Sequence, residues 1–287
     1  MKRLHNHIDK RMLKQMMNES GVKRITISFY QYANIGNPQV FRDHLYLNWQ
    51  PLGVLGRTYV AREGVNAQIS VPKENFKSLK DQLNTIEFLA GIRLNIARED
   101  DGKSFYKLKI KVRDKIVADG LNDETFDVTD KGKHLNAKEF NELTDQEGTI
   151  LIDMRNHYES EVGHFEGAIC PDVDTFREEI GVVAKMLDGN EDKNIVMYCT
   201  GGIRCEKASA WFKHKGFDNV HQLEGGIIEY DRQVKEQALT NKFKGKNFVF
   251  DERRSERISD DVISVCHQCG AAADDHTNCA NKGCNLL

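Results

Sequence analysis

The spacing of apolar and polar positions divides the chain into two parts with different rhythms. In the first part, alternation of apolar and polar residues predicts strands, and apolar residues three and four positions apart predict helices. These patterns place strands at 23–32, 56–63, 66–71 and 105–113, and helices at 38–50 and 73–86. Their order is that of a ferredoxin-like α+β domain, which we expect over residues 21–117, after a basic N-terminal arm of residues 1–20.

The rhythm changes after a polar stretch at residues 118–129, which we interpret as a linker. Short apolar runs predict buried strands at 149–154, 194–199 and 219–223, and helical patterns cover 136–143 and 205–217. Apolar strands that alternate with helices indicate a parallel α/β sheet. We assign this sheet to residues 130–240, and the remaining residues 241–287 to a tail that is first basic and then rich in cysteine.

The composition narrows the class of protein. Hydrophobic residues make up 39% of the chain and charged residues 30%, which is typical of a soluble globular protein. The sequence shows neither a signal peptide nor an apolar run long enough to span a membrane, so we expect a cytoplasmic location. The seven cysteines are then expected to be thiols, metal ligands or catalysts rather than disulfides.

Charge is distributed unevenly along the chain. Residues 141–240 carry 10 Lys and Arg against 20 Asp and Glu, whereas the rest of the chain carries 31 against 24. Basic flanks around an acidic module indicate an anionic partner that the flanks hold. The alternative interpretation is that the exposed lysines of the flanks only keep the protein soluble, which explains the same uneven charge distribution.

The segment YCTGGIRCEKAS, residues 198–209, carries the clearest chemical signal of the chain. Cys199 falls at the carboxyl end of a predicted parallel strand, where α/β sheets bind their ligands. The next four residues are expected to turn their backbone amides toward its sulfur, and they are Thr200, Gly201, Gly202 and Ile203. With Arg204 and the following helix, these amides are predicted to lower the pKa of Cys199 and to keep a nucleophilic thiolate.

The spacing between Cys199 and Arg204 selects among several chemistries. A loop that wraps a phosphate needs five residues between its Cys and its Arg, and this loop has four. It therefore suits a smaller atom, such as the outer sulfur of a persulfide. A metal site would need further ligands nearby, and a disulfide does not fit the cytoplasm. If Cys199 were only a buried core residue, the presence of the two adjacent glycines and of Arg204 would stay unexplained.

Three separated signatures resemble a rhodanese domain, and they are LIDMRNHYESEVGHFEGAI, YCTGGIRCEKAS and LEGGIIEY. This resemblance implies that Cys199 forms a persulfide and that Asp153 and Arg155 brace its loop. The segment GRTYVAREGVNAQISV and the tail CHQCGAAADDHTNCANKGC resemble the rhodanese-containing tRNA uridine hydroxylases, and this likeness spans nearly the whole chain. It implies oxygen-dependent 5-hydroxylation of the wobble uridine, with molecular oxygen as co-substrate and the tRNA anticodon region as partner. It also allows a sulfur donor.

Two other functions stay open. The first is a sulfurtransferase, which moves sulfane sulfur. The second is a non-catalytic rhodanese-like binding module. Cys205 also has two interpretations: it resolves an oxidised Cys199 as a transient disulfide, or it is a thiol of the first helical turn that points away. The sequence contains no glycine-rich dinucleotide fingerprint, so we expect neither flavin nor NAD.

The flanks hold the remaining candidates. Cys-x2-Cys is half of a zinc knuckle, and the tail offers a zinc site formed by Cys266, Cys269, Cys279 and Cys284. Phosphate contacts of an RNA require basic side chains, for which the candidates are Lys10, Arg11, Lys107, Lys109 and Lys111. A splayed base needs aromatic partners, for which Tyr30, Tyr32 and Trp49 are available. Alternating lysines equally fit a solvated strand face.

Overall fold

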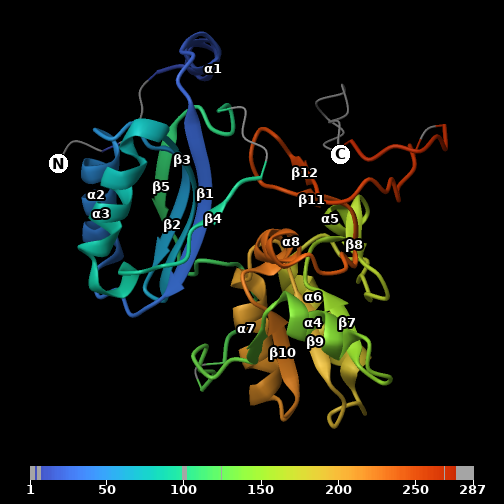
Figure 1. The fold of residues 1–287 in the computed structure, drawn as a ribbon. Coiled ribbons are helices and arrows are strands. Elements are labelled where there is room, and N and C mark those ends of the chain that lie inside the picture. Colours follow the sequence, from blue (N-terminus) through green and yellow to red (C-terminus); the bar gives the residue numbers. More distant parts are fainter. Residues whose placement is uncertain (1–3, 5–7, 99–101, 124, 268, 276–287) are drawn as a thin grey trace. The chain divides into compact units, whose positions relative to one another are not determined.

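The computed structural model of the chain describes residues 4, 8–98, 102–123, 125–267 and 269–275 (Figure 1). The chain forms two units. The first comprises residues 1–117 with 250–253, and the second comprises residues 118–249 with 254–287. Within the described ranges, no helix is long and apolar enough to cross a membrane.

The first unit follows the predicted ferredoxin-like order. After α1 (Lys10–Glu19) come β1 (Arg24–Tyr32), α2 (Pro38–Trp49), β2 (Leu55–Ala61), β3 (Gly64–Pro72), η1 (Lys73–Asn75), α3 (Phe76–Asn84), η2 (Glu87–Leu89), β4 (Asn95–Ile96) and β5 (Leu108–Val112). The sheet order is β4-β1-β3-β2-β5, and the first three pairings in it are antiparallel. This arrangement confirms the ferredoxin-like fold.

One strand of this sheet lies at the opposite edge from its predicted place. Residues 105–113 are the last strand of the predicted ferredoxin-like order, whose place beside β1 is filled by the short β4. β5 instead extends the other edge, where it runs parallel to β2. β4 is two residues long, too short to show an alternating pattern, and alternation in residues 105–113 does not encode which edge they join.

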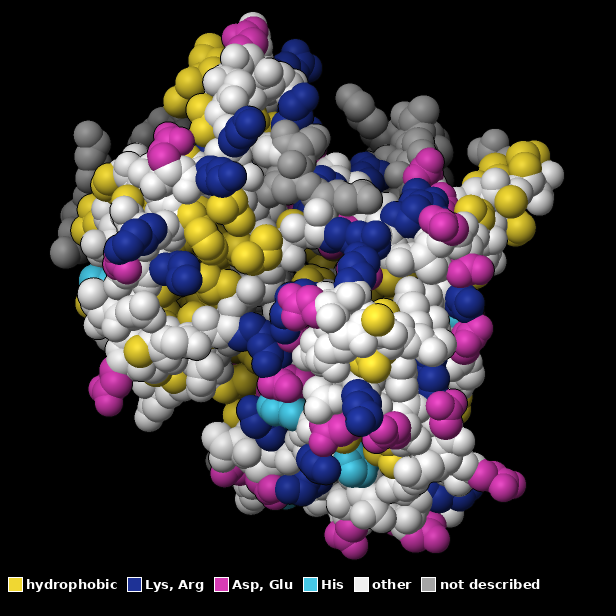
Figure 2. Space-filling view, viewed as in Figure 1, with side chains coloured by type: hydrophobic (Ala, Val, Ile, Leu, Met, Phe, Trp, Pro, Cys, Tyr) yellow, Lys and Arg dark blue, Asp and Glu magenta, His cyan; other side chains and the backbone are white. Residues whose placement is uncertain are grey.

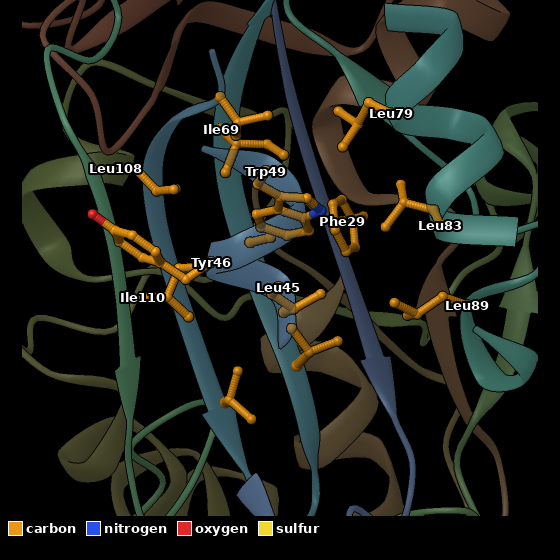
Figure 3. Close-up of a cluster of buried hydrophobic side chains, with 14 of the residues drawn as sticks. Phe29, Leu45, Tyr46, Trp49, Ile69, Leu79, Leu83, Leu89, Leu108 and Ile110 are labelled. Carbon is orange, nitrogen blue, oxygen red and sulfur yellow. The ribbon is translucent and has the colours of Figure 1, made fainter. Parts of the chain in front are cut away.

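The core of the first unit is centred on the indole of Trp49, which lies between the sheet and the helices α2 and α3 (Figure 3). Its side chain is fully buried, its ring meets Phe29 edge to face at 6.3 Å, and its Nε1 donates a hydrogen bond to Gln82 Oε1 at 2.9 Å. The prediction that Trp49 stacks on a base is therefore wrong, because no face of its ring is accessible.

The second unit is the predicted parallel α/β fold. Its elements are β6 (Lys133–Leu135), α4 (Ala137–Thr144), β7 (Ile150–Asp153), α5 (His157–Ser160), β8 (Gly163–Phe165), α6 (Phe176–Leu187), β9 (Ile195–Tyr198), α7 (Ile203–His214), β10 (Val220–Leu223) and α8 (Gly226–Gln237). The sheet order is β6-β10-β9-β7, and every pairing is parallel. α4 packs on α8 and α6 on α7; β9 is buried throughout and β7 is apolar up to Asp153, whereas β6 and β10 also carry polar residues.

The segments on both sides of this fold are also part of the second unit. In residues 118–129, which the sequence suggested as a linker, Asp119 is buried and its Oδ2 lies 2.5 Å from Lys207 Nζ. In the predicted tail, β11 (Phe243–Phe248) pairs with β8 and with β12 (Ser255–Arg257), all antiparallel. Phe243 is buried against Phe165, with ring centroids 5.1 Å apart.

Candidate active site

Cys199 directly follows β9, and α7 begins four residues later. Gly202 is the N-cap of α7 with a φ of 100°, a left-handed conformation that suits glycine and turns the loop toward the sulfur. Its amide donates to Cys199 Sγ at 3.1 Å. Thr200, Gly201 and Ile203 are half-buried, whereas Cys199 itself is 1% exposed. The amide of Gly202 therefore faces the sulfur, which lies below the surface.

The surroundings of Cys199 favour its thiolate. Burial alone would raise the pKa of this thiol, but four hydrogen-bonding and charge effects outweigh it and lower the pKa to about 5. They are a hydrogen bond from the Cys205 thiol, the positive charge of Arg204, and the backbone amides of Cys205 and Arg204. Cys199 is therefore an anion at neutral pH.

Cys205 is turned toward the active-site sulfur, so the interpretation that it points away from Cys199 is wrong. Its side chain is fully buried, and its S–H donates to the Cys199 sulfur. Burial and this contact raise the pKa of Cys205 well above the ordinary value of a thiol. The site thus holds one thiolate and one thiol in direct contact, and both cysteines are free.

Arg204 acts on the sulfur through its charge, because its strong side-chain hydrogen bonds go to Glu159 and a longer one, at 3.5 Å, goes to Thr200 Oγ1. Nη1 donates to Glu159 Oε1 at 2.6 Å and Nη2 donates to Glu159 Oε2 at 2.9 Å, with the carboxylate fully buried. Glu159 also accepts the amide of Asn156 at 3.1 Å and completes the capping box of α5. This fork holds the guanidinium in one place beside the loop.

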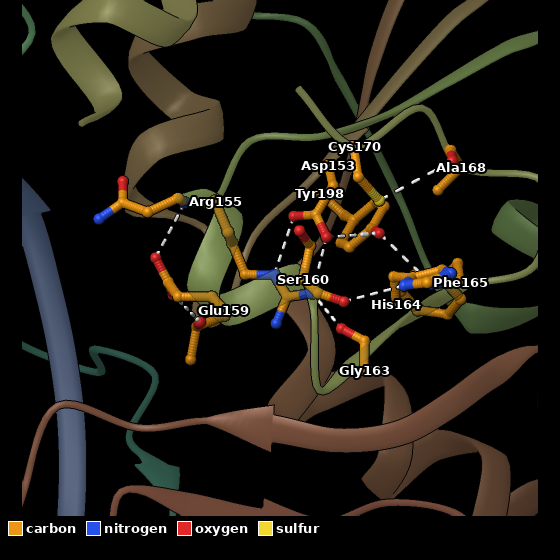
Figure 4. Close-up of polar contacts among 12 residues, drawn as sticks. Asp153, Arg155, Glu159, Ser160, Gly163, His164, Phe165, Ala168, Cys170 and Tyr198 are labelled. Carbon is orange, nitrogen blue, oxygen red and sulfur yellow. Dashed lines mark hydrogen bonds and ion pairs between the residues drawn. The ribbon is translucent and has the colours of Figure 1, made fainter. Parts of the chain in front are cut away.

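Asp153 and Arg155 form a second buried pair, next to the strand that leads into the loop (Figure 4). Arg155 donates to Asp153 from Nε at 2.8 Å and from Nη2 at 2.6 Å. Tyr198 OH donates to Asp153 Oδ2 at 2.7 Å, and Tyr198 immediately precedes Cys199. The pair thus reaches the loop through Tyr198, and no hydrogen bond is described from either member to residues 199–204.

The start of α8 supports the loop from behind. The amides of Ile227 and Ile228 donate to the carbonyls of Cys199 and Thr200 at 3.0 and 3.3 Å. Gly226 has a φ of +65°, and a Cβ there would lie 2.4 Å from the Cys199 carbonyl oxygen. Only glycine allows this close approach of two backbones.

The predicted RNA-binding residues belong to the first unit, and the predicted metal-binding residues belong to the tail of the second. Arg11 and Lys109 are exposed and Lys107 and Lys111 are half-buried in the first unit, while the side chain of Lys10 lies outside the described part. Cys266 is half-buried and Cys269 exposed, and Cys279 and Cys284 lie outside the described residues. Among the residues that are described, no three metal-binding side chains come together.

Sequence reasoning missed Glu159 and Glu179, two buried carboxyl groups that act on Arg204 and Cys199. The sequence placed Glu159 at a helix start, and its capping-box spacing from Asn156 supports that role. Its pairing with Arg204 joins residues 45 positions apart, which no local pattern reveals.

Comparison with known proteins gives the same order of domains. Residues 24–116 match the UPF0176 acylphosphatase like domain, residues 136–233 match the Rhodanese-like domain, and residues 244–287 match the Rhodanase C-terminal family. These matches accord with the two folds described above.

Several proteins named tRNA uridine(34) hydroxylase are similar over nearly the whole chain. The one from Photorhabdus laumondii is 58% identical over 285 residues, which are 99% of this chain and 81% of that protein. The one from Leptospira interrogans is 54% identical over 284 residues, 99% of this chain and 77% of that protein. The one from Escherichia coli O81 is 56% identical over 285 residues, 99% of this chain and 81% of that protein. Similarity of this extent shows that the chain belongs to the tRNA uridine(34) hydroxylase family.

Proposed function

We propose that this protein is an oxidoreductase that hydroxylates uridine 34, the wobble base of tRNA, at carbon 5 with molecular oxygen. Membership of the family supports the reaction and the substrate. The observation that locates this reaction in the chain is the lowered pKa of Cys199, about 5. This cysteine lies at the carboxyl end of a parallel sheet, where such folds bind their ligands.

Each side chain of the site has a role in this proposal. Cys199 supplies the anionic sulfur, the loop amides and Arg204 stabilise it, and Asp153 with Arg155 positions Tyr198 at the end of β9. Insertion of one oxygen atom into a C–H bond leaves the second atom to be reduced to water by two electrons. Oxidation of the Cys199 thiolate and the Cys205 thiol to a disulfide releases two electrons and one proton, and with one further proton from solvent the pair balances that reduction.

We further propose that tRNA contacts the face of the first sheet that α2 and α3 leave uncovered. On this face, Arg57 is paired with Lys109 and Tyr59 with Lys111 across β2 and β5. Polar and aromatic residues continue the same two rows on β3 and β1, namely Asn66, Gln68, Ser28 and Tyr30. Positive charges lie close together on this face. Burial most strongly, and then the charges of Lys111, Lys107 and Arg57, lower the pKa of Lys109.

The chemistry of this sheet face fits a single-stranded nucleic acid. Cationic groups hold phosphates, aromatic rings stack on unpaired bases, and amides pair with base edges. Residues 1–117 carry 21 Lys and Arg against 11 Asp and Glu, so the whole unit attracts polyanions. On the view in Figure 2, Lys and Arg side chains are spread over this unit, while Asp and Glu are more frequent on the other.

The tail supports a structural zinc site, which we propose for Cys266, Cys269, Cys279 and Cys284. Cys266 donates its amide to Ala271 O at 2.8 Å and accepts the amide of Gly270 at 2.8 Å. A tight turn is the backbone form that a Cys-x2-Cys half-site requires. We also propose a cytoplasmic location, where thiols stay reduced.

Nucleoside analysis of tRNA tests the main proposal. In a strain that lacks the gene and every other route to 5-hydroxyuridine, the unaltered chain is expected to restore the nucleoside, and Cys199→Ser and Cys205→Ser are expected to fail. His214→Gln, in the same unit but outside the loop, is the control that should restore it. Restoration by Cys199→Ala would overturn the enzyme assignment and favour a non-catalytic binding module.

A sulfurtransferase is the second candidate, and the small amide loop around Cys199 favours it. Such an enzyme takes sulfane sulfur from a donor as a Cys199 persulfide and passes it on. Brisk turnover of thiosulfate that depends on Cys199, together with unchanged 5-hydroxyuridine in the deletion strain, would replace the hydroxylase proposal by this one.

A further inference from the structure

Glu179 is a buried carboxyl group with no evident structural use. It lies in the first turn of α6, its side chain is fully buried, and neither of its oxygens has a hydrogen-bond partner among the described residues. Native proteins seldom leave a buried polar group unsatisfied, because desolvation without a partner is unfavourable. Such a group beside reactive residues indicates a role in their chemistry.

Glu179 belongs to α6, which packs against α7, the helix that begins with Ile203, Arg204 and Cys205, and charged groups of the candidate active site act on it. Burial raises its pKa most strongly, Arg204 opposes this, and Asp153, Glu159 and Cys199 raise it further, to about 10. Glu179 therefore carries a proton at neutral pH. A protonated carboxyl without an acceptor is a hydrogen-bond donor held ready inside the site.

The proton on Glu179 depends on the charge of Cys199. The carboxylates of Asp153 and Glu159 are each paired with an arginine, and the charge of the thiolate is the part of this environment that a reaction at Cys199 removes. When Cys199 Sγ forms a covalent bond, its negative charge disappears and one of the effects that hold the proton is removed. Glu179 then becomes a stronger acid at the moment when a leaving group gains negative charge.

We propose that Glu179 is the proton donor for bond-forming reactions at Cys199, an inference that rests on the nucleophile assigned under the proposed function. The Cys199 thiolate attacks an electrophile X–Y, the S–X bond forms, and the X–Y electron pair leaves with Y. The proton moves from the Glu179 carboxyl to Y, so the products are Cys199–S–X, HY and the Glu179 carboxylate. Charge and atoms balance without an external oxidant or reductant.

Two small reagents that place the same group on Cys199 test this step. Methyl methanethiosulfonate and dimethyl disulfide both yield the Cys199 methyl disulfide, but the first releases a weakly basic sulfinate and the second a strongly basic thiolate. A proton donor accelerates only the second reaction, since only a basic leaving group needs the proton. The rate is followed on the full chain by mass spectrometry of the peptide that contains Cys199.

In Glu179→Gln, the dimethyl disulfide reaction is expected to slow by about 100-fold, while the thiosulfonate reaction stays within about twofold of the unaltered chain. Glu179→Met has a similar shape and no acid, and loses no hydrogen bond, so it should fold and show the same selective loss. Glu178→Gln changes an exposed carboxylate one position earlier on α6, and both of its rates should be unchanged.

Equal slowing of both reactions in the Glu179 variants would overturn the proposal, because it would mean that Glu179 only shapes the loop. Unchanged rates in both would overturn it too. If Cys199 of the unaltered chain reacts with neither reagent, the nucleophile itself is refuted. Refutation of the nucleophile is distinguishable from refutation of the Glu179 role, because it is seen in the unaltered chain.

Discussion

The charge of Arg204 is one of the effects that keep Cys199 in its thiolate form. Arg204 lies beside the sulfur, yet both of its hydrogen-bonding nitrogens are engaged by Glu159. Loss of Arg204 alone would strand a buried carboxylate, which typically destabilises a protein by about 3–5 kcal/mol. A clean test of its electrostatic effect must therefore neutralise both partners together.

The double variant Arg204→Gln/Glu159→Gln is expected to fold and to raise the pKa of Cys199 by about 1 unit or more. Only the thiolate is reactive, so the alkylation rate of the unaltered chain should fall as the pH drops through about 5. In the double variant this fall should begin at higher pH. Iodoacetamide kinetics at Cys199 across the acid range measure the shift, and an unmoved midpoint would show that the Cys205 thiol and the amides hold the thiolate without Arg204.

At the scale of elements, the loop is clamped between β9 and the start of α8. Gly226 permits this contact because a side chain would collide with the backbone of Cys199 and Thr200. Gly189 has a similar left-handed conformation, with a φ of +76°, but a Cβ there would meet nothing within 4 Å. Alanine variants at these two glycines therefore distinguish the effect of backbone strain alone from that of a steric collision with the loop.

Gly226→Ala is expected to lower the alkylation rate of Cys199 by about tenfold or more at neutral pH, since the loop must shift to admit the methyl group. Gly189→Ala should lose about 1 kcal/mol of unfolding free energy from strain and keep the full rate. The two measurements are thermal unfolding and iodoacetamide kinetics. Equal rates in both variants would contradict the clamp.

The sequence predicts helices, strands and loops where residues close together in the chain determine them. The Cys199 loop follows from a run of adjacent residues, and the capping box at Asn136 and Glu139 from a separation of three. The edge that β5 joins, the burial of Trp49 and the contact of Glu179 with the site depend on packing between distant segments. The orientation of Cys205 depends on where α7 begins, which is Ile203 rather than the predicted residue 205.

At the scale of the whole molecule, positive and negative charge are separated along the sequence. Residues 1–117 hold 21 Lys and Arg against 11 Asp and Glu, whereas residues 118–287 hold 20 against 33. A polyanion is therefore attracted to the first unit and repelled by much of the second. This asymmetry predicts that tRNA affinity depends strongly on salt and on lysines of the first sheet.

Lys109→Gln/Lys111→Gln is expected to weaken tRNA binding and to reduce the slope of log affinity against log salt by about 2, one for each phosphate contact. Lys77→Gln/Lys80→Gln, on α3, removes the same charge from the other side of the sheet and should leave the slope nearly unchanged. Alkylation of Cys199 should be normal in both. Identical slopes in the two double variants would refute the proposed face.

The antiparallel pair of β8 and β11 limits how this protein can be divided and recombined. A gene fragment that ends at residue 240 would encode the whole Cys199 loop but omit Phe243, and it would leave Phe165 and the edge of β8 uncovered. Any exchange of this module between proteins, by evolution or by an engineer, must therefore carry the chain through Arg257.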